Sequence, residues 1–264
     1  MTELLIQDFV LSALLAGIIL SIPLGILGCF TLWKRMTFFG DAMGHAAIFG
    51  VAGGLLFSSS PAIGVLISSI GAVLILSRHR ESSILPMDTW LGIVSYGGLA
   101  AGLIIITLNP QLRVNPETVL FGEIFATTHD DILLITLCSI VTIMTIWLKW
   151  RSLLLVSINE DLAKTTGVNV TACKTIIFSL MALTTAVSVK IVGGLMLPAL
   201  LIFPAASVTR SATPETMVAK AIISALIIFI LGFLSSLYFD LPCAPCLVLV
   251  GITILILNKL TSFK

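Results

Sequence analysis

Residues 35–50 read Arg35-Met-Thr-Phe-Phe-Gly-Asp-Ala-Met-Gly-His-Ala-Ala-Ile-Phe-Gly50, an apolar run that carries one carboxylate and one imidazole. Asp41 and His45 are four residues apart, about one helical turn, so a helix places both side chains on one face. An ionisable pair in an apolar helix is unfavourable unless it is paired or used, and both groups are ligands for divalent metals. The pair makes a metal contact the first functional hypothesis. The spacing alone favours the structural alternative, in which Asp41 caps the helix and His45 is a hydrogen-bonded interior residue.

Composition indicates that this helix belongs to a membrane protein. The chain has 264 residues, of which 58% are hydrophobic and only 10% charged, whereas a soluble domain has about 25% charged residues. The formal net charge is +1 and the basic residues stand in small clusters, a pattern that gives no sign of nucleic-acid binding. No long polar linker interrupts the chain, so residues 1–264 are predicted to form a single integral domain in the lipid membrane.

Apolar runs of about 17 to 25 residues match single crossings of the hydrocarbon core. Gly193-Gly194, Pro198 and Pro204 divide one overlong apolar region into a full span and a shorter, interrupted one. The sequence therefore predicts an all-α, polytopic transmembrane helical bundle with about nine spans, and eight are possible. The expected spans are residues 9–33, 41–57, 61–77, 88–108, 131–148, 175–192, 195–208, 221–239 and 245–257.

Charge placement favours an odd number of spans. With the N-terminus outside and the C-terminus in the cytoplasm, every Lys and Arg except Arg113 and Lys190 faces the cytoplasm, as the positive-inside tendency expects. Eight spans would place Lys259 and Lys264 outside. Lys190, beside the expected helix break, is interpreted as a structural or gating residue because its charge would repel a divalent metal.

Small residues recur every four positions in the second expected span, at Ala42, Ala46, Gly50 and Gly54. This spacing predicts a helix-packing face that another helix can approach closely. If two copies of the chain share a seam there, two carboxylates and two imidazoles could surround one ion. Such a ligand set suits tetrahedral zinc and, with added water, manganese.

The run from Leu32 to Ala46 resembles the signature of the membrane subunits of bacterial metal-uptake ABC transporters, which import zinc, manganese or iron, and is most similar to the zinc importers. The resemblance implies a permease that moves a divalent metal, zinc first, across the bacterial cytoplasmic membrane by ATP-driven alternating access. It also implies that Asp41 and His45 are the ion contacts. Further matches cover nearly the whole chain: Asp88-Thr-Trp-Leu-Gly-Ile93, Leu120-Phe-Gly-Glu123, Ser157-Ile-Asn-Glu-Asp-Leu-Ala163, Gly167-Val168, Lys190-Ile-Val-Gly193 and Leu200-Leu-Ile-Phe-Pro-Ala-Ala206.

The resemblance implies partners as well: a second copy in a homodimer, two cytoplasmic ATP-binding subunits, and an extracytoplasmic metal-binding protein that delivers the ion. The sequence has no G-x-x-x-x-G-K-[ST] phosphate loop and no Gly-Lys dipeptide, so a partner subunit must use the ATP. We therefore expect a translocation subunit rather than an enzyme, with a transported metal but no permanently bound cofactor.

The segment Asn159-Glu-Asp-Leu-Ala-Lys-Thr-Thr-Gly167 begins with a helix-capping Asn and two acids, and it ends at a Gly suited to a C-cap. A short amphipathic cytoplasmic helix is predicted there, with a solvated connector as the alternative. In the resembling family this segment is the coupling helix that docks into the ATPase. The resemblance thereby implies coupling roles for Asn159, Glu160, Asp161, Leu162, Ala163 and Gly167.

Other interpretations stay open. Manganese or iron could replace zinc because Asp and His serve all three metals, and a secondary metal/proton transporter would also contain broken helices and buried ionisable residues. An intramembrane metalloenzyme would need more ligands and a general base, and the sequence has no H-E-x-x-H motif. Cys243-Ala-Pro-Cys246 could form a local disulfide or offer soft ligands, but a single CxxC is weak evidence, so we exclude it from the metal site.

Overall fold

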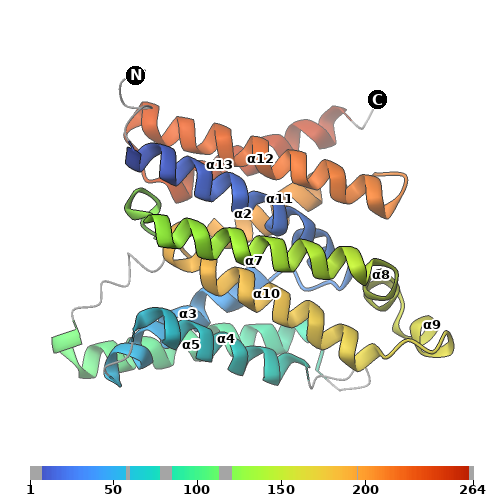
Figure 1. Ribbon diagram of the computed structural model, residues 1–264, viewed down its shortest axis with the longest axis horizontal. Coiled ribbons are helices and arrows are strands. Elements are labelled where there is room, and N and C mark those ends of the chain that lie inside the picture. Colours follow the sequence, from blue (N-terminus) through green and yellow to red (C-terminus); the bar gives the residue numbers. More distant parts are fainter. Residues whose placement is uncertain (1–7, 58–59, 78–84, 113–120, 195, 262–264) are drawn as a thin grey trace.

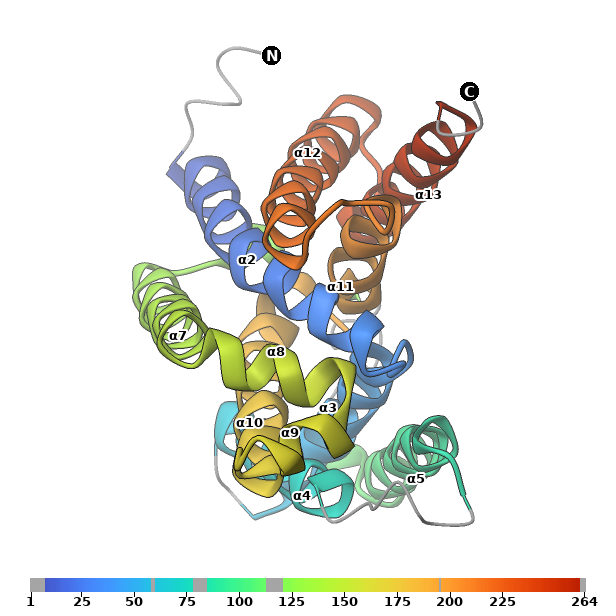
Figure 2. The ribbon, with the colours of Figure 1, turned by 90° about the vertical axis from the view of Figure 1, so that its right-hand side faces the viewer.

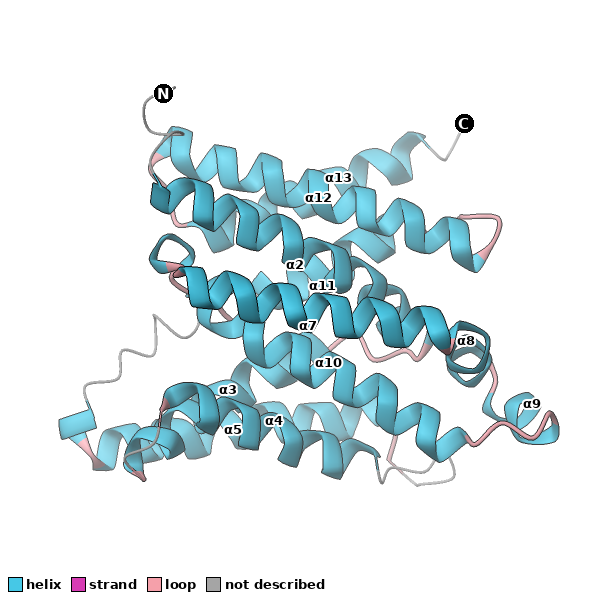
Figure 3. Cartoon of the chain, viewed as in Figure 1, coloured by secondary structure: helices cyan, strands magenta, loops and turns pink. Residues whose placement is uncertain are grey.

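A computed structural model describes residues 8–57, 60–77, 85–112, 121–194 and 196–261 of the chain. Within these residues the regular structure is helical and no strand occurs, as predicted. Figures 1 and 3 show the longer helices lying side by side in one bundle. The helices are α2 (Asp8–Trp33), α3 (Phe39–Leu56), α4 (Pro61–Ser77), α5 (Met87–Leu108), α7 (His129–Leu148), α8 (Trp150–Ile158), α9 (Glu160–Thr165), α10 (Val170–Val192), α11 (Met196–Ser207), α12 (Pro214–Phe239) and α13 (Cys243–Thr261), with 3₁₀ turns at Pro110–Leu112 and Ile124–Ala126.

Seven of the described helices are long and apolar enough to cross a membrane: α2, α3, α5, α7, α10, α12 and α13. The helices α4 and α11 are apolar but shorter, with 17 and 12 residues. Each of the nine expected spans therefore overlaps an apolar helix, and seven of these helices have the length of a full crossing. The count of nine and the sides on which the termini lie stay predictions.

The break predicted between α10 and α11 is present. The helix α10 ends at its C-cap Gly193, whose φ of 76° lies in the left-handed region that favours glycine. The helix α11 begins three residues later and contains Pro204. The side chain of Lys190 lies outside the described part of the structure, so its predicted structural or gating role stays a prediction.

Polar side chains fix several helix starts. Thr128 and Asp131 form a capping box at the start of α7, and Thr213 and Thr216 form another at the start of α12. The side-chain oxygen of Asn169 accepts from the backbone N–H of Ala172, which starts α10 before the expected apolar run. Each of these side chains satisfies backbone donors that have no partner inside the helix.

The bundle has two groups of helices. In Figures 1 and 2, α2, α11, α12 and α13 lie on one side and α3, α4 and α5 on the other, with α10 between them. The helix α2 packs along α11 and α12, and α3 packs along α4 and α5. The short helices α8 and α9 lie at one end of the bundle (Figure 1). This arrangement places α3, which carries Asp41 and His45, among packed helices.

Candidate functional site

Asp41 and His45 lie on the same side of α3, near its start, as the four-residue spacing predicts. The Oδ2 atom of Asp41 is 3.8 Å from the Nδ1 atom of His45. The N-cap residue of α3 is Phe38, and it makes no side-chain cap hydrogen bond. Asp41 is in the first turn of the helix, where a negative charge is stabilised by the helix dipole.

A residue that the sequence interpretation missed joins the pair. Ser95, on α5, donates its hydroxyl hydrogen to Oδ2 of Asp41 over 3.2 Å, and its Oγ lies 2.7 Å from Nδ1 of His45. Ser95 is buried. It is separated from His45 by 50 residues in the sequence, so no local pattern could pair them, and a serine in an apolar span has no signal of its own.

Glycines of α5 allow this contact. A Cβ atom placed on Gly98 would lie 3.1 Å from the Cα of Ala46, and one placed on Gly102 would lie 2.8 Å from the backbone nitrogen of Phe49. The backbones of α3 and α5 therefore approach closely because these positions have no side chain. The close approach brings the short Ser95 side chain within reach of α3.

The small residues Ala42, Ala46, Gly50 and Gly54 are all buried. Gly50 and Gly54 lie against Gly64 of α4, while Ala46 lies against Gly98 of α5. These contacts are within one chain. Ala46, Gly50 and Gly54 are therefore already covered by helices of the same chain.

Asp41 and His45 are only half-buried, with side-chain exposures of 38% and 18%. Phe49, one further turn along, is 41% exposed, so this side of α3 is open in the single chain. Within the described residues, no three His, Cys, Asp or Glu side chains come together as a metal site would need. One chain thus brings together two donors of these types, Asp41 and His45, at this position.

The predicted short helix is α9. The Asn159 side chain accepts from the backbone N–H of Leu162 at 3.0 Å and caps its start. Its end is a Schellman motif at Gly167, whose φ is 78°. The backbone N–H of Val168 donates to the carbonyl of Ala163, and that of Gly167 donates to Lys164. Asp161 and Leu162 are exposed, whereas Glu160 and Ala163 are buried.

Glu160 attaches α9 to the rest of the bundle through ion pairs with two lysines. The sequence did not predict either pairing. Its Oε1 atom is 3.2 Å from Nζ of Lys34, at the end of α2, and its Oε2 atom is 2.5 Å from Nζ of Lys174, on α10. The three side chains are only 8%, 7% and 14% exposed. Burial raises the pKa of Glu160, but the hydrogen bonds and charges of the two lysines lower it more, so the pKa is below its usual value.

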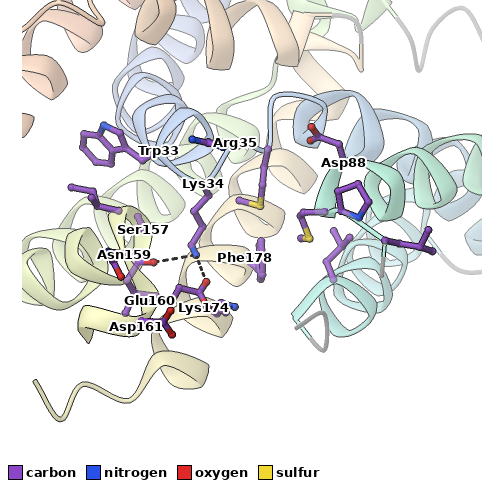
Figure 4. Close-up of a pocket in the computed structure, with 17 residues that line it drawn as sticks. Trp33, Lys34, Arg35, Asp88, Ser157, Asn159, Glu160, Asp161, Lys174 and Phe178 are labelled. Carbon is purple, nitrogen blue, oxygen red and sulfur yellow. Dashed lines mark hydrogen bonds and ion pairs between the residues drawn. The ribbon is translucent and has the colours of Figure 1, made fainter. Parts of the chain in front are cut away.

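A cavity of about 570 Å³ lies beside this ion network, whose three side chains form part of its wall. Figure 4 shows the Lys34 side chain reaching towards Glu160, with Lys174 beside it and Asp88, from the first turn of α5, on the other side of the cavity. Arg35 also contributes to its wall. The connection between α2 and α3 therefore borders the same space as α9.

The two cysteines of the CxxC segment, which we exclude from the metal site, are both buried. Cys243 and Cys246 are both buried free thiols in the first turns of α13. Free Cys commonly packs as a small apolar residue. No metal cluster of the usual donors includes them within the described residues.

Three comparisons relate the chain to known proteins. Residues 6–262 match the ABC 3 transport family. The chain is 33% identical over 252 residues to the high-affinity zinc uptake system membrane protein ZnuB of Haemophilus influenzae, covering 95% of this chain and 97% of that protein. It is 28% identical over 264 residues to the manganese transport system membrane protein MntC of Halalkalibacterium halodurans, covering 99% and 90%. The solved structure of PsaBC from Streptococcus pneumoniae in complex with Fab matches with a TM-score of 0.83 at 26% identity, covering 97% of this chain and 93% of that one.

Proposed function

The chain belongs to the ABC 3 transport family, and we propose that it is the permease subunit of an ABC importer whose cargo is zinc. It is a multi-pass protein of the cytoplasmic membrane, and the part of the chain that the structure describes contains seven span-length apolar helices. Zinc is favoured because the zinc permease ZnuB is 33% identical to this chain. Carboxylate and imidazole are also ligands that zinc commonly takes.

One observation carries the assignment of the ion contacts: Asp41 and His45 share one face of a span-length helix and are both partly open. Ionisable side chains in membrane spans are costly and usually face a path, a cavity or a partner. We place the cargo ion at these two side chains during its passage.

We further propose that the open side of α3 meets a second copy of the chain. One chain offers one carboxylate and one imidazole here, whereas a homodimer offers two of each, enough for a four-coordinate ion. Contact with the second copy would also remove Asp41 from the lipid, where a carboxylate is unfavourable. The ion path then lies between the two copies.

The helix α9 is proposed to couple this path to two ATP-binding partner subunits. Its outer face presents Leu162 and Asp161 to a partner, while Glu160 holds Lys34, which lies just before the connection into α3. A displacement of α9 is thereby passed to the α2–α3 connection and to Asp41. An extracytoplasmic binding protein would deliver the ion to the opposite side.

The orientation proposed for the chain has the N-terminus outside and the C-terminus in the cytoplasm. In Figure 1 the start of α2 and the end of α13 lie towards opposite ends of the bundle, and α9 lies at the end towards which α13 runs. This geometry supports an odd number of crossings. The basic residues Lys34, Lys149 and Lys259 then face inward, in line with the positive-inside tendency.

The test is zinc uptake by membrane vesicles that contain the assembled transporter. We expect His45→Ala to abolish uptake, because it removes one of the two donors that each chain contributes. His129→Ala is the matched control, since His129 is exposed at the start of α7 and should be dispensable. Normal uptake by the His45 variant, at equal amounts of protein in the membrane, would overturn the assigned contact.

Manganese is the second candidate cargo because the manganese permease MntC is 28% identical to this chain and the same donors accept manganese. Competition in the same vesicles separates the two. An equal concentration of manganese should leave zinc uptake nearly unchanged if zinc is the cargo. A secondary metal/proton transporter would continue to import when the ATP-binding subunits are omitted, whereas an ABC importer would stop.

A further inference from the structure

Ser95 contacts both proposed ion contacts from a different helix. Its hydroxyl donates to Oδ2 of Asp41 at 3.2 Å, and its Oγ is 2.7 Å from Nδ1 of His45. Serines in helices often return their hydrogen to a carbonyl of the preceding turn. Ser21 does so to Gly17, and Ser188 does so to Thr184. Ser95 instead uses its hydrogen to bridge α5 and α3.

The hydrogens of this bridge determine the state of the imidazole. A hydroxyl has one hydrogen, and that of Ser95 is donated to Asp41. A carboxylate accepts, so the arrangement that satisfies both contacts at once has the Ser95 hydrogen on Asp41 and a hydrogen carried by Nδ1 of His45 on the Ser95 oxygen. In a neutral imidazole the other nitrogen, Nε2, then carries the free lone pair that binds a metal.

We propose that Ser95 is a positioning residue of the transport site: it holds His45 in the tautomer with hydrogen on Nδ1, so that Nε2 faces the ion as a ligand, and it fixes the rotation of the Asp41 carboxylate. The proposal rests on the proposed function for its cargo. Metal-binding histidines generally donate their second ring N–H to a partner that sets the tautomer and orientation. Here a hydroxyl backed by the carboxylate fills that position.

The first experiment reads the tautomer directly, without transport. The full chain is labelled with ¹⁵N at histidine, placed in lipid vesicles without metal, and studied at a pH where imidazole is neutral. The chain contains only three histidines, so the His45 signals are assigned by their loss in His45→Ala. We expect hydrogen on Nδ1 in the wild type. In Ser95→Ala we expect a shift towards the Nε2–H form, which is the one that a free imidazole side chain prefers.

The second experiment measures zinc uptake by the assembled transporter at sub-saturating zinc chloride. We expect Ser95→Ala to lower the rate about 10- to 100-fold, the usual effect of removing a partner behind a metal ligand. Ser69→Ala is the matched control, because Ser69 on α4 is as buried as Ser95, each being 2% exposed, and its hydroxyl has no hydrogen-bond partner among the described residues. Uptake by the Ser69 variant should equal that of the wild type.

The outcomes separate this inference from the proposed function. If Ser95→Ala keeps both the wild-type tautomer and wild-type uptake while His45→Ala abolishes uptake, the positioning role is wrong and the permease assignment stands. If His45→Ala transports normally, the ion contact and the role of Ser95 are both wrong.

If Ser95→Ala does not reach the membrane, Ser95→Thr and Ser95→Val replace it. These two side chains have the same shape, so only Ser95→Thr should keep the tautomer and the uptake, and equal behaviour overturns the inference.

Discussion

Gly98 sets the distance between Ser95 and the α3 residues that it contacts. We predict that Gly98→Ala lowers zinc uptake, because the new Cβ atom would lie 3.1 Å from the Cα of Ala46 and 3.4 Å from the carbonyl oxygen of His45. The two helices must then separate by a few tenths of an ångström. Overpacking of this kind costs about 1–3 kcal/mol. Thermal unfolding of the purified protein and vesicle uptake should both show the loss.

The neighbouring glycine provides the control. A Cβ atom on Gly97 meets no atom within 4 Å, so Gly97→Ala should keep uptake and raise helix stability by about 0.5–1 kcal/mol. The same loss in both variants would show that α5 tolerates no side chain at all, and the specific role given to the Gly98 contact would be wrong.

Only part of the site could be predicted from the sequence, and these residues show the physical reason. Asp41 and His45 belong to one helix, so helical geometry alone predicts that they share a face. Ser95 reaches them only because α3 and α5 pack closely, and that contact depends on tertiary structure. The ion pairs of Lys34 and Lys174 with Glu160 could not be predicted for the same reason. Glu160 is far from Lys34 in the sequence, and only the packed bundle brings the three side chains together.

At the scale of elements, α9 depends on Glu160 for its attachment. We predict that Glu160→Gln loosens α9 and uncouples ATP hydrolysis from transport, because both ammonium groups lose the carboxylate that they contact. Breaking a buried ion pair from one side costs about 3–5 kcal/mol. Hydrogen exchange of the α9 amides should become faster, and zinc uptake should fall more than ATP hydrolysis in the assembled transporter.

Asp161→Asn is the matched control for that variant. Asp161 lies next to Glu160 on the same short helix, but its side chain is 84% exposed and its partner Lys164 is exposed too. Exposed pairs contribute little because water and salt screen them. If both variants uncouple the transporter equally, the outer charge of α9 matters rather than its buried anchor.

Acid should release the same attachment. The lysines hold the pKa of Glu160 below its usual value, so the carboxylate stabilises the folded state at every pH above the unfolded-state pKa, about 4.3. That contribution disappears as the pH falls through the lowered pKa of the folded protein. The stability difference between wild type and Glu160→Gln should therefore be constant from pH 7 to about pH 5 and shrink in stronger acid. A difference that keeps its neutral value at pH 3 would contradict the ion network.

The elements themselves follow largely from the sequence. Apolar length predicts the helices that make up the bundle, and the Gly193-Gly194 pair predicts the break before α11. The helix α8 was not expected, because its nine residues follow the expected span 131–148 and form an apolar run too short for a crossing. It forms where α7 ends at Lys149, which also begins α8. Such a turn between two consecutive helices is set by packing against the bundle rather than by periodicity.

At the scale of the whole molecule, the open side of α3 decides how two copies would meet. Asp41, His45 and Phe49 follow one another at four-residue intervals along this side, and Phe49 is 41% exposed. Ala46, Gly50 and Gly54 of α3 already lie against α4 and α5 of the same chain. A homodimer that shares the ion must therefore bring together the sides of α3 that carry these three residues.

We predict that Phe49→Cys in membranes is linked into a covalent dimer by a short bifunctional maleimide, because the proposed homodimer would place the two copies of this position opposite each other. The five native cysteines are buried, so they should react slowly.

Leu231→Cys is the control: it is 47% exposed on α12, which lies across the bundle from α3 in Figures 1 and 2. Gel mobility after denaturation measures the linked fraction. Zinc should slow the reaction at Phe49→Cys, since an ion held one turn away orders the same seam. If the Leu231 variant is linked and the Phe49 variant is not, α12 forms the contact between copies, and each chain must bind its ion without ligands from the other.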